Sequence, residues 1–174
     1  ASVFPILLGG ASAAWYALKY VPYSRLCDSM EQKYHDVDGK GTRYSMTDGE
    51  FQYLVKMPPY LGFESGFARV SPAENDRLYF YDSENDTEGY AASYDGTYVD
   101  LFVWLRVGGG TDYGVMIRDG SASFSQLLID RELNYISYGG ETDEEAERRR
   151  RLIEENIDQI SALMNAAQNM WDLE

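Results

Sequence analysis

The sequence predicts an α+β protein with an N-terminal helix, an antiparallel β-meander of about five to seven strands, and a C-terminal amphipathic helix packed on the sheet. Three observations predict it: an uncharged run from Val3 to Leu18, strand-like alternation through the middle of the chain, and helical periodicity after Thr142. We expect residues 1–22 to form a membrane-anchoring helix and residues 23–174 to form a single acidic α+β domain.

The N-terminal segment has the length and composition of a transmembrane helix. About twenty apolar residues cross a bilayer, and residues 1–22 supply this length with Lys19 near the end, where its ammonium group can reach the headgroups. Trp15, Tyr16 and Tyr20 cluster at the same end, as interfacial aromatic residues do. We therefore expect a single-pass membrane protein of an organelle or bacterial inner membrane. A buried core helix, an uncleaved signal peptide and a surface helix remain the alternatives.

Small residues recur along this segment and predict a helix-packing face. They are Gly9, Gly10, Ala13, Ala14 and Ala17, and their spacing of four residues places them along one side of a helix. Because small side chains let two helices approach closely, the segment is expected to pack against another membrane helix.

Alternating residues predict the strands of the meander. The first runs from Phe51 to Met57 and the second from Leu78 to Tyr81. Asp95-Gly96 predicts a hairpin between residues 91–94 and the strand 97–107, because this dipeptide favours type I′ turns. Later strands are expected at residues 113–118, 124–129 and, more weakly, 135–138.

The strand 97–107 is expected to lie in the centre of the sheet. Its alternation places Val99, Leu101 and Val103 on one face, with Tyr98, Asp100, Phe102 and Trp104 on the other.

A long C-terminal helix follows Gly139 and Gly140. Thr142 and Glu145 form a capping-box pattern that predicts its first turn. An apolar stripe of Ile153, Ile157, Ile160, Met164, Ala167 and Trp171 follows at helical spacing. We expect this stripe to cover one face of the sheet; an intermolecular coiled coil is the alternative.

The charge of the chain excludes one class of partner and favours another. A formal net charge of −14 repels nucleic acid, so we expect no nucleic-acid binding. The same charge favours basic or cationic protein partners, although acidic residues also serve simply to keep a domain soluble.

The sequence contains no recognisable catalytic or cofactor-binding pattern. His35 is the single histidine and Cys27 the single cysteine, so His-based metal clusters and intrachain disulfides are excluded. A superficial calcium-loop pattern at Asp36, Asp38, Gly39 and Gly41 fails because Lys40 and Thr47 occupy ligand positions. We therefore expect no cofactor, no metal and no enzymatic activity.

An acidic run is the candidate partner-binding site in the acidic domain. It contains Asp82, Glu84, Asp86 and Glu88, and Trp171 at the end of the last helix is a further candidate residue. The alternatives for the run are a solvated hairpin tip and a site for a hard cation.

Three functions follow, in order of preference. The first is a non-catalytic accessory or assembly subunit of a larger membrane protein complex, whose acidic domain contacts other protein subunits. The second is a membrane-tethered inhibitor or immunity-type protein that binds a basic partner. The third is a carboxylate-based hydrolase that uses Asp100 or the acidic run.

Overall fold

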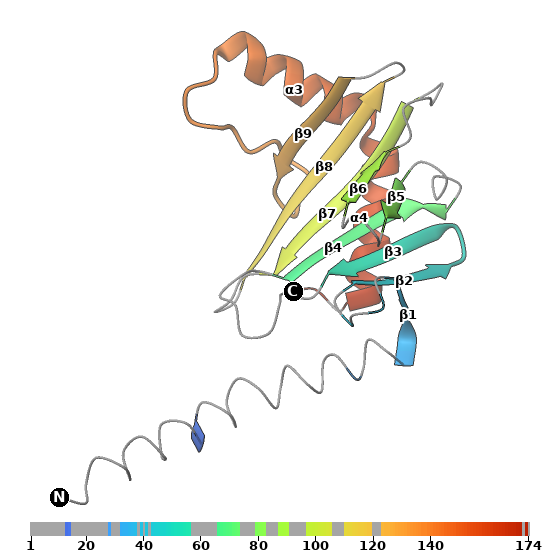
Figure 1. Ribbon diagram of the computed structural model, residues 1–174. Coiled ribbons are helices and arrows are strands. Elements are labelled where there is room, and N and C mark those ends of the chain that lie inside the picture. Colours follow the sequence, from blue (N-terminus) through green and yellow to red (C-terminus); the bar gives the residue numbers. More distant parts are fainter. Residues whose placement is uncertain are drawn as a thin grey trace, which may run out of the picture.

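The fold is built around one antiparallel sheet whose strands follow the chain almost in order. The computed structural model describes residues 13–14, 28, 32–37, 39, 41, 43–56, 66–73, 79–82, 87–90, 97–105, 110–119, 123–171 and 173. Its strands are β1 (His35–Asp36), β2 (Arg43–Asp48), β3 (Phe51–Lys56), β4 (Gly66–Pro72), β5 (Tyr79–Asp82), β6 (Thr87–Tyr90), β7 (Thr97–Leu105), β8 (Thr111–Asp119) and β9 (Ser123–Ile129). Seven of them form the main sheet in the order β1-β2-β3-β4-β7-β8-β9, and β5 and β6 form a separate two-stranded sheet (Figure 1). The predicted α+β class and the antiparallel sheet are confirmed.

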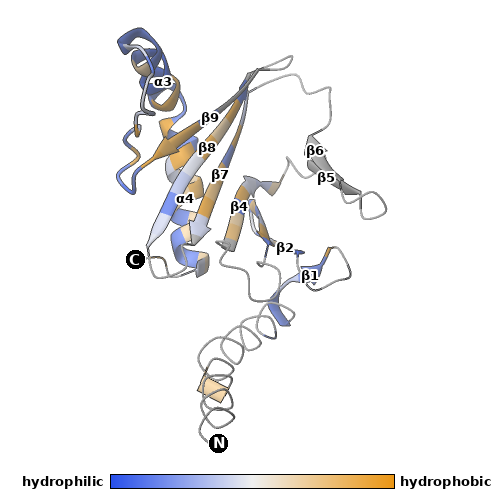
Figure 2. Ribbon diagram, turned by 60° about the vertical axis from the view of Figure 1, so that its left-hand side comes forward, coloured by the Kyte–Doolittle hydropathy of each residue, from blue (hydrophilic) through white to orange (hydrophobic). Residues whose placement is uncertain are grey.

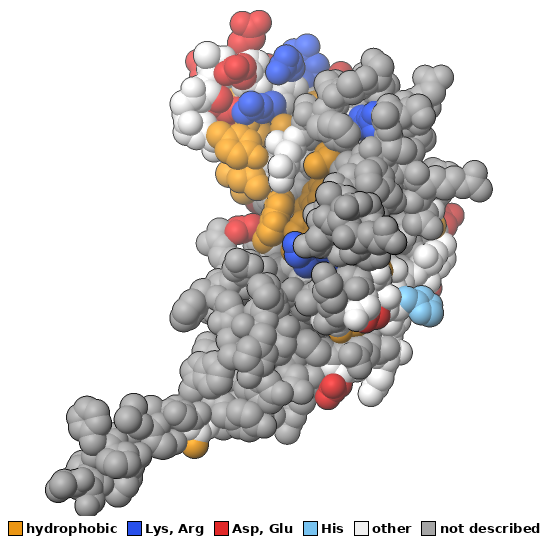
Figure 3. Space-filling model, in the orientation of Figure 1, with side chains coloured by type: hydrophobic (Ala, Val, Ile, Leu, Met, Phe, Trp, Pro, Cys, Tyr) orange, Lys and Arg blue, Asp and Glu red, His pale blue; other side chains and the backbone are white. Residues whose placement is uncertain are grey.

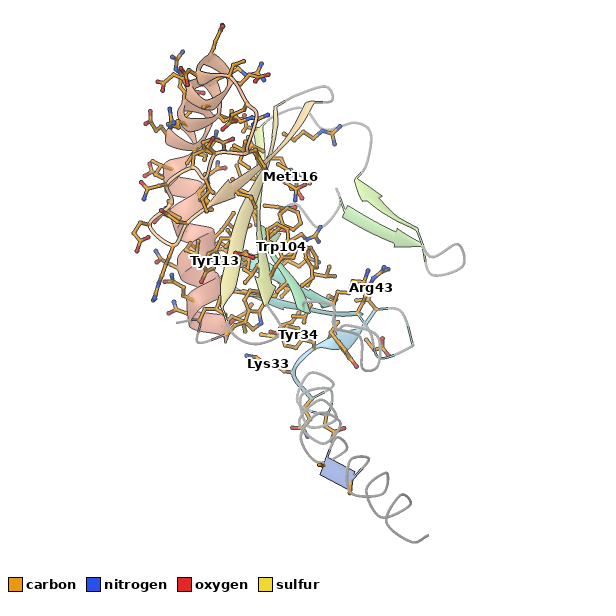
Figure 4. All side chains as sticks on the ribbon, turned by 90° about the vertical axis from the view of Figure 1, so that its left-hand side faces the viewer. Lys33, Tyr34, Arg43, Trp104, Tyr113 and Met116 are labelled. Carbon is orange, nitrogen blue, oxygen red and sulfur yellow. The ribbon has the colours of Figure 1, made fainter. Side chains whose placement is uncertain are left out.

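The C-terminal helices lie on one side of the main sheet. They are α3 (Asp143–Glu155) and α4 (Ile157–Trp171). α4 packs against β4 and β7 in the middle of the sheet, whereas α3 is largely hydrophilic and extends past β9 (Figure 2). The β5–β6 pair lies on the side of the main sheet opposite α4 (Figures 2 and 4).

A break at Asn156 divides the C-terminal helix, which corrects the prediction of one continuous helix. The side-chain amide of Asn156 donates to the Leu152 carbonyl oxygen at 2.9 Å, and its backbone N–H donates to the Ile153 carbonyl oxygen at 3.1 Å. Asparagine side chains that bond nearby carbonyls compete with the regular helical pattern. Ile157 begins the second helix and stays 39% exposed, so it does not belong to the buried stripe in which it was predicted.

The capping box at the start of α3 is confirmed. The Thr142 hydroxyl accepts the Glu145 backbone N–H at 3.2 Å, and the Glu145 carboxylate accepts the Thr142 backbone N–H at 2.9 Å. Because the backbone bond favours the charged carboxylate, it lowers the pKa of Glu145.

The core lies between α4 and the first face of the sheet, which carries Val99, Leu101 and Val103 of β7. These three side chains are at most 1% exposed, as predicted for a central strand. The other buried core residues are Tyr34, Tyr44, Tyr53, Val55, Ala68, Val70, Tyr113, Val115, Ile117, Leu127, Ile129, Ile153, Ile160, Leu163, Met164, Ala166 and Ala167. Burial of this apolar surface is the main favourable contribution to the stability of such a domain.

The middle of the second face, at β4 and β7, is buried as well and carries charged residues. Asp100 of β7 is 0% exposed, and Arg69 of β4 is 2% exposed. The Tyr98 hydroxyl donates a hydrogen bond to Asp100, and Arg69 Nη1 lies 3.8 Å from Asp100 Oδ2. Burying a charge is unfavourable unless it is paired and hydrogen-bonded, and this arrangement provides both.

The hairpin predicted at Asp95-Gly96 is only partly described. Asp95-Gly96 and residues 91–94 lie outside the described residues, so their pairing with the next strand stays a prediction. That next strand, β7, pairs with β8 over Thr97–Leu105 and with β4 over Leu101–Leu105. Residues 135–138 form only an isolated bridge, between Tyr135 and Ile129, where a weak strand was predicted.

The predicted membrane helix lies almost wholly outside the described residues. Of residues 1–22, only Ala13 and Ala14 are described; both are helical and exposed. Within the described part of the chain, no helix combines the length and the apolar character needed to cross a bilayer.

Candidate partner-binding groove

A groove runs between α4 and the hairpin of β2 and β3 and has a volume of about 680 Å³. It exists because α4 packs on β4 and β7 and does not cover the tip of the β2–β3 hairpin. Its lining residues are Lys33, Met46, Asp48, Gly49, Glu50, Phe51, Tyr53, Ala162, Asn165, Ala166, Asn169 and Met170. We call this cavity the α4 groove. Its volume is within the range of pockets that bind ligands or a few side chains of a partner.

A tight turn fixes the acidic end of the α4 groove. Asp48 pairs with Phe51 at the end of the hairpin, so only Gly49 and Glu50 form the loop. Gly49 has φ +60°, whereas Glu50 has no positive φ, which is the pattern of a type II′ turn. The Glu50 carbonyl oxygen accepts the backbone N–H of Ala73 at 2.8 Å, which ties the turn to the end of β4.

The carboxylates of this turn are open to solvent. Asp48 and Glu50 are both exposed, whereas Phe51 between them and the core is partly buried. The acidic end of the α4 groove is therefore a pair of solvated carboxylates beside an apolar floor.

The floor and the helix wall of the α4 groove have different chemistry. Met46 and Phe51 are partly buried and pack against the core, so the floor is apolar. On α4, the exposed residues Ala162, Asn165 and Asn169 form the opposite wall. Alanine at position 162 leaves space, and the two amides offer donors and acceptors to a bound backbone.

A smaller cavity of about 420 Å³ continues the groove along α4. It shares Glu50, Phe51 and Ala162 with the α4 groove and adds Pro72 and Gln159 among its lining residues. Together the two cavities form an accessible surface along α4 that is longer than a pocket for one side chain.

An aromatic cluster lies at the other end of the groove. The Trp171 indole N–H donates to the Tyr34 hydroxyl at 3.0 Å, and the Trp171 and Tyr53 rings meet edge to face with centroids 5.6 Å apart. Burial raises the pKa of Tyr34, and burial together with the charge of Asp48 raises the pKa of Tyr53. Both phenols are therefore neutral at pH 7. Lys33 and Tyr34 lie next to each other near the C-terminal end of α4 (Figure 4).

Among the predicted partner-binding residues whose side chains the structure describes, Trp171 lies near this groove. The indole is partly buried, and its hydrogen bond to Tyr34 gives it a structural role. Sequence reasoning does not identify Asp48, Glu50 or Ala162. The pattern Asp48-Gly49-Glu50 between alternating residues is the signal for the turn, but no local signal indicates that α4 leaves the turn uncovered.

The predicted acidic run is only partly described. Asp82 ends β5 and pairs with Thr87, while Glu88 of β6 pairs with Tyr81. Glu84 and Asp86 lie outside the described residues. Among the residues that the structure describes, no group of three His, Cys, Asp or Glu side chains is arranged to hold a metal ion.

Most of the predicted helix-packing residues also lie outside the described residues. Ala13 and Ala14 are exposed, and Gly9, Gly10 and Ala17 are not described. Their proposed packing against a membrane helix stays a prediction.

Asp36 has a structural role in its loop. Its carboxylate accepts the backbone N–H groups of Gly39 at 2.9 Å and Gly41 at 3.2 Å, and both glycines have positive φ angles. These bonds account for the aspartate and glycine pattern that superficially resembled a calcium loop.

A second exposed surface lies beside α3. Ile136 and Tyr138 are 44% and 38% exposed, and the Arg149 guanidinium lies 5.5 Å from the centre of the Tyr138 ring. In Figure 3, hydrophobic side chains gather next to Lys or Arg side chains in the region where Figure 1 places α3. The α4 groove combines a cavity with exposed carboxylates and an apolar floor, so it is the better candidate site.

Comparison with known proteins gives no relative: no protein-family model, no curated protein and no solved structure matches this chain.

Proposed function

We propose that this chain is a non-catalytic accessory or assembly subunit of a larger membrane protein complex. Residues 1–22 anchor it, and its acidic domain binds partner subunits through the α4 groove. The observation that carries this proposal is a groove with an apolar floor and two exposed carboxylates, on a chain with a net charge of −14. Such a groove favours a protein segment that carries both apolar and basic side chains.

The position of the groove in the chain supports a membrane-proximal role. Lys33 lines the groove, and only about ten residues separate it from the proposed anchor at residues 1–22. This length of chain reaches at most about 35 Å when extended and about 15 Å when helical. A partner bound in the groove would therefore lie close to the bilayer surface.

A membrane-tethered inhibitor or immunity-type protein that binds a basic partner is the second candidate, and the same two carboxylates favour it. It predicts a one-to-one complex with a soluble basic partner, and this complex weakens as salt screens the attraction. A hydrolase has less support, because Asp100 is buried and bonded to Tyr98 beside Arg69.

Membrane fractionation tests the proposed function. We expect the full chain to pellet with membranes without detergent and to co-purify in mild detergent with a constant set of subunits. A chain lacking residues 1–22 should stay soluble and lose those subunits. If both versions are soluble and monomeric, the anchored-subunit function is wrong.

A matched variant separates anchoring from packing. Replacing Gly9, Gly10 and Ala13 with leucine keeps the segment apolar but removes its small residues. We expect this variant to pellet with membranes and to lose its membrane-embedded partners. Unchanged co-purification would contradict the proposed packing face.

A further inference from the structure

We propose that the α4 groove binds a cationic amphipathic segment of a partner protein, with apolar side chains on Phe51 and lysine or arginine side chains facing Asp48 and Glu50. This inference rests on the proposed partner-binding function and names the chemistry of the partner.

The apolar floor of the groove favours apolar side chains in the bound segment. Met46 pairs with Tyr53 and Asp48 pairs with Phe51 across the hairpin, so these side chains share the first face of the sheet. Met46 and Phe51 pack on the core but remain partly open to the groove. Covering them with apolar side chains would remove this surface from water and favour binding.

The acidic end of the groove selects the charge of the segment. Asp48 and Glu50 are two residues apart on the same turn. Gly49 and the hydrogen bond from the Ala73 N–H to the Glu50 carbonyl oxygen fix the conformation of this turn. Lys33, the basic lining residue, lies near the opposite end with Tyr34 and α4 (Figure 4). Positive side chains at one end of the bound segment would therefore complement the turn and set the direction in which the segment lies.

Charge also disfavours a second copy of this chain as the occupant. Each copy carries a net charge of −14, so two copies repel each other before the groove is filled. A basic segment instead gains attraction from the turn and from the whole domain.

The probe for the test is a fluorescein-labelled synthetic peptide of leucine and lysine, with the leucines at helical spacing on one face and the lysines on the other. Its controls have every lysine changed to glutamate, or every leucine changed to serine. We expect the full chain, in mild detergent, to bind the probe at least tenfold more tightly than either control. Equal binding of the serine peptide would overturn the apolar part of the proposal.

Two charge reversals of equal size separate the groove from the general acidity of the domain. Asp48→Lys with Glu50→Lys changes the groove, whereas Glu154→Lys with Glu155→Lys changes exposed residues of α3. Both pairs move the net charge from −14 to −10. We expect the first pair to weaken binding of the probe about tenfold and the second less than twofold. If both double variants lose the same affinity for the probe, general electrostatic attraction explains the binding, and the proposal is overturned.

A charge-neutral variant tests the groove itself. Ala162→Trp fills the groove from an exposed position of α4, where the larger side chain can be accommodated without disturbing the core. Its matched control is Ile157→Trp, at an exposed position of α4 that does not line the groove. We expect Ala162→Trp to weaken binding of the probe at least tenfold and Ile157→Trp to leave it unchanged.

All variants share the same detergent, so partitioning of the peptide into micelles cancels in the comparison. Unchanged binding by Ala162→Trp would overturn the proposal. A dimer of the chain alone in sedimentation that Ala162→Trp dissociates would assign the groove to a second copy and would also overturn it. Membrane fractionation does not enter these measurements, so failure here is distinguishable from failure of the proposed anchoring.

Discussion

At the scale of single residues, Gly114 is fixed by an aromatic ring that lies on it. A Cβ atom at this position would meet the Cζ3 and Cη2 atoms of Trp104 at 2.8 Å and the Leu127 carbonyl oxygen at 3.3 Å. Trp104 cannot move away freely, because its ring stacks on Phe102 with centroids 6.0 Å apart and also contacts Phe67. The glycine therefore allows a large ring to lie flat on the second face of the sheet.

We expect Gly114→Ala to lower the free energy of unfolding by about 1–2 kcal/mol. Overpacking costs about 1–3 kcal/mol, and the lower backbone entropy of alanine offsets up to about 1 kcal/mol of this loss. The control is Gly139→Ala, where nothing lies within 4 Å of the added Cβ and the unfolding free energy should stay within about 0.5 kcal/mol. Urea unfolding measures both variants, and an unchanged Gly114→Ala midpoint would contradict the position of the Trp104 ring.

The sequence predicts the first face of β7 correctly but not the burial of its second face. The alternation of Val99, Leu101 and Val103 shows the first face directly. Arg69 and Asp100 look like solvent-facing residues in the sequence, because only their partners across strands make their burial favourable. For the same reason β4, which contains Arg69, is not among the predicted strands.

At the scale of elements, a network around Glu141 fixes the loop that leads into α3. The Glu141 carboxylate accepts hydrogen bonds from the Ser137 and Tyr135 hydroxyls and forms an ion pair with Arg149 of α3. The Ser137 bond, followed by those to Tyr135 and Arg149, lowers the pKa of Glu141. α3 itself buries only Ala146 and Ile153, so this network contributes much of its attachment.

We expect Glu141→Gln to destabilise the protein at pH 7 and to lose this effect in acid. Because the carboxyl pKa is lower in the folded chain, the folded state favours the charged form. Its stabilisation is complete above the ordinary carboxyl pKa of 4.5 and declines as the pH falls through the lower folded value.

Thermal unfolding of the wild-type protein and Glu141→Gln between pH 3 and pH 7 measures this difference. Glu147→Gln is the control, because Glu147 and Arg150 form a solvent-exposed pair at 3.2 Å that contributes little. A constant difference between the wild type and Glu141→Gln across this range would exclude the carboxylate as its source.

Local signals predict the ends of the helices better than their continuity. Thr142 and Glu145 are three residues apart and identify the start of α3 from the sequence alone. The break at Asn156 has no comparable signal, since the apolar spacing continues through Ile153, Ile157 and Ile160. The side-chain bond of Asn156 to Leu152 is what interrupts the helix.

At the scale of the whole molecule, α4 connects the two edges of the sheet. The chain leaves the sheet after β9 at one edge, and α4 then crosses β4 and β7. Trp171 at its end contacts Tyr34, which directly precedes β1 at the other edge. The α4 groove exists because the helix crosses the middle of the sheet, and this path cannot be read from local sequence.

We expect the Trp171 and Tyr34 side chains to be energetically coupled. Trp171→Phe and Tyr34→Phe each remove one partner of the 3.0 Å hydrogen bond, which contributes about 0.5–1.5 kcal/mol. The double variant should therefore be more stable than the sum of the two single losses predicts, by about the same amount. Urea unfolding of the four proteins measures the coupling, and strictly additive losses would show that this contact does not stabilise the fold.

The order of these elements along the chain also affects how the protein is made. The ribosome synthesises all strands of the main sheet before α4, so the apolar first face has no cover while the strands emerge. Roughly forty residues separate the end of β9 from the end of α4, and their synthesis takes about 2–8 s. For those seconds the nascent chain exposes valine- and isoleucine-rich strands that readily aggregate. We therefore expect newly made protein to aggregate less when a holding chaperone is present until α4 is synthesised.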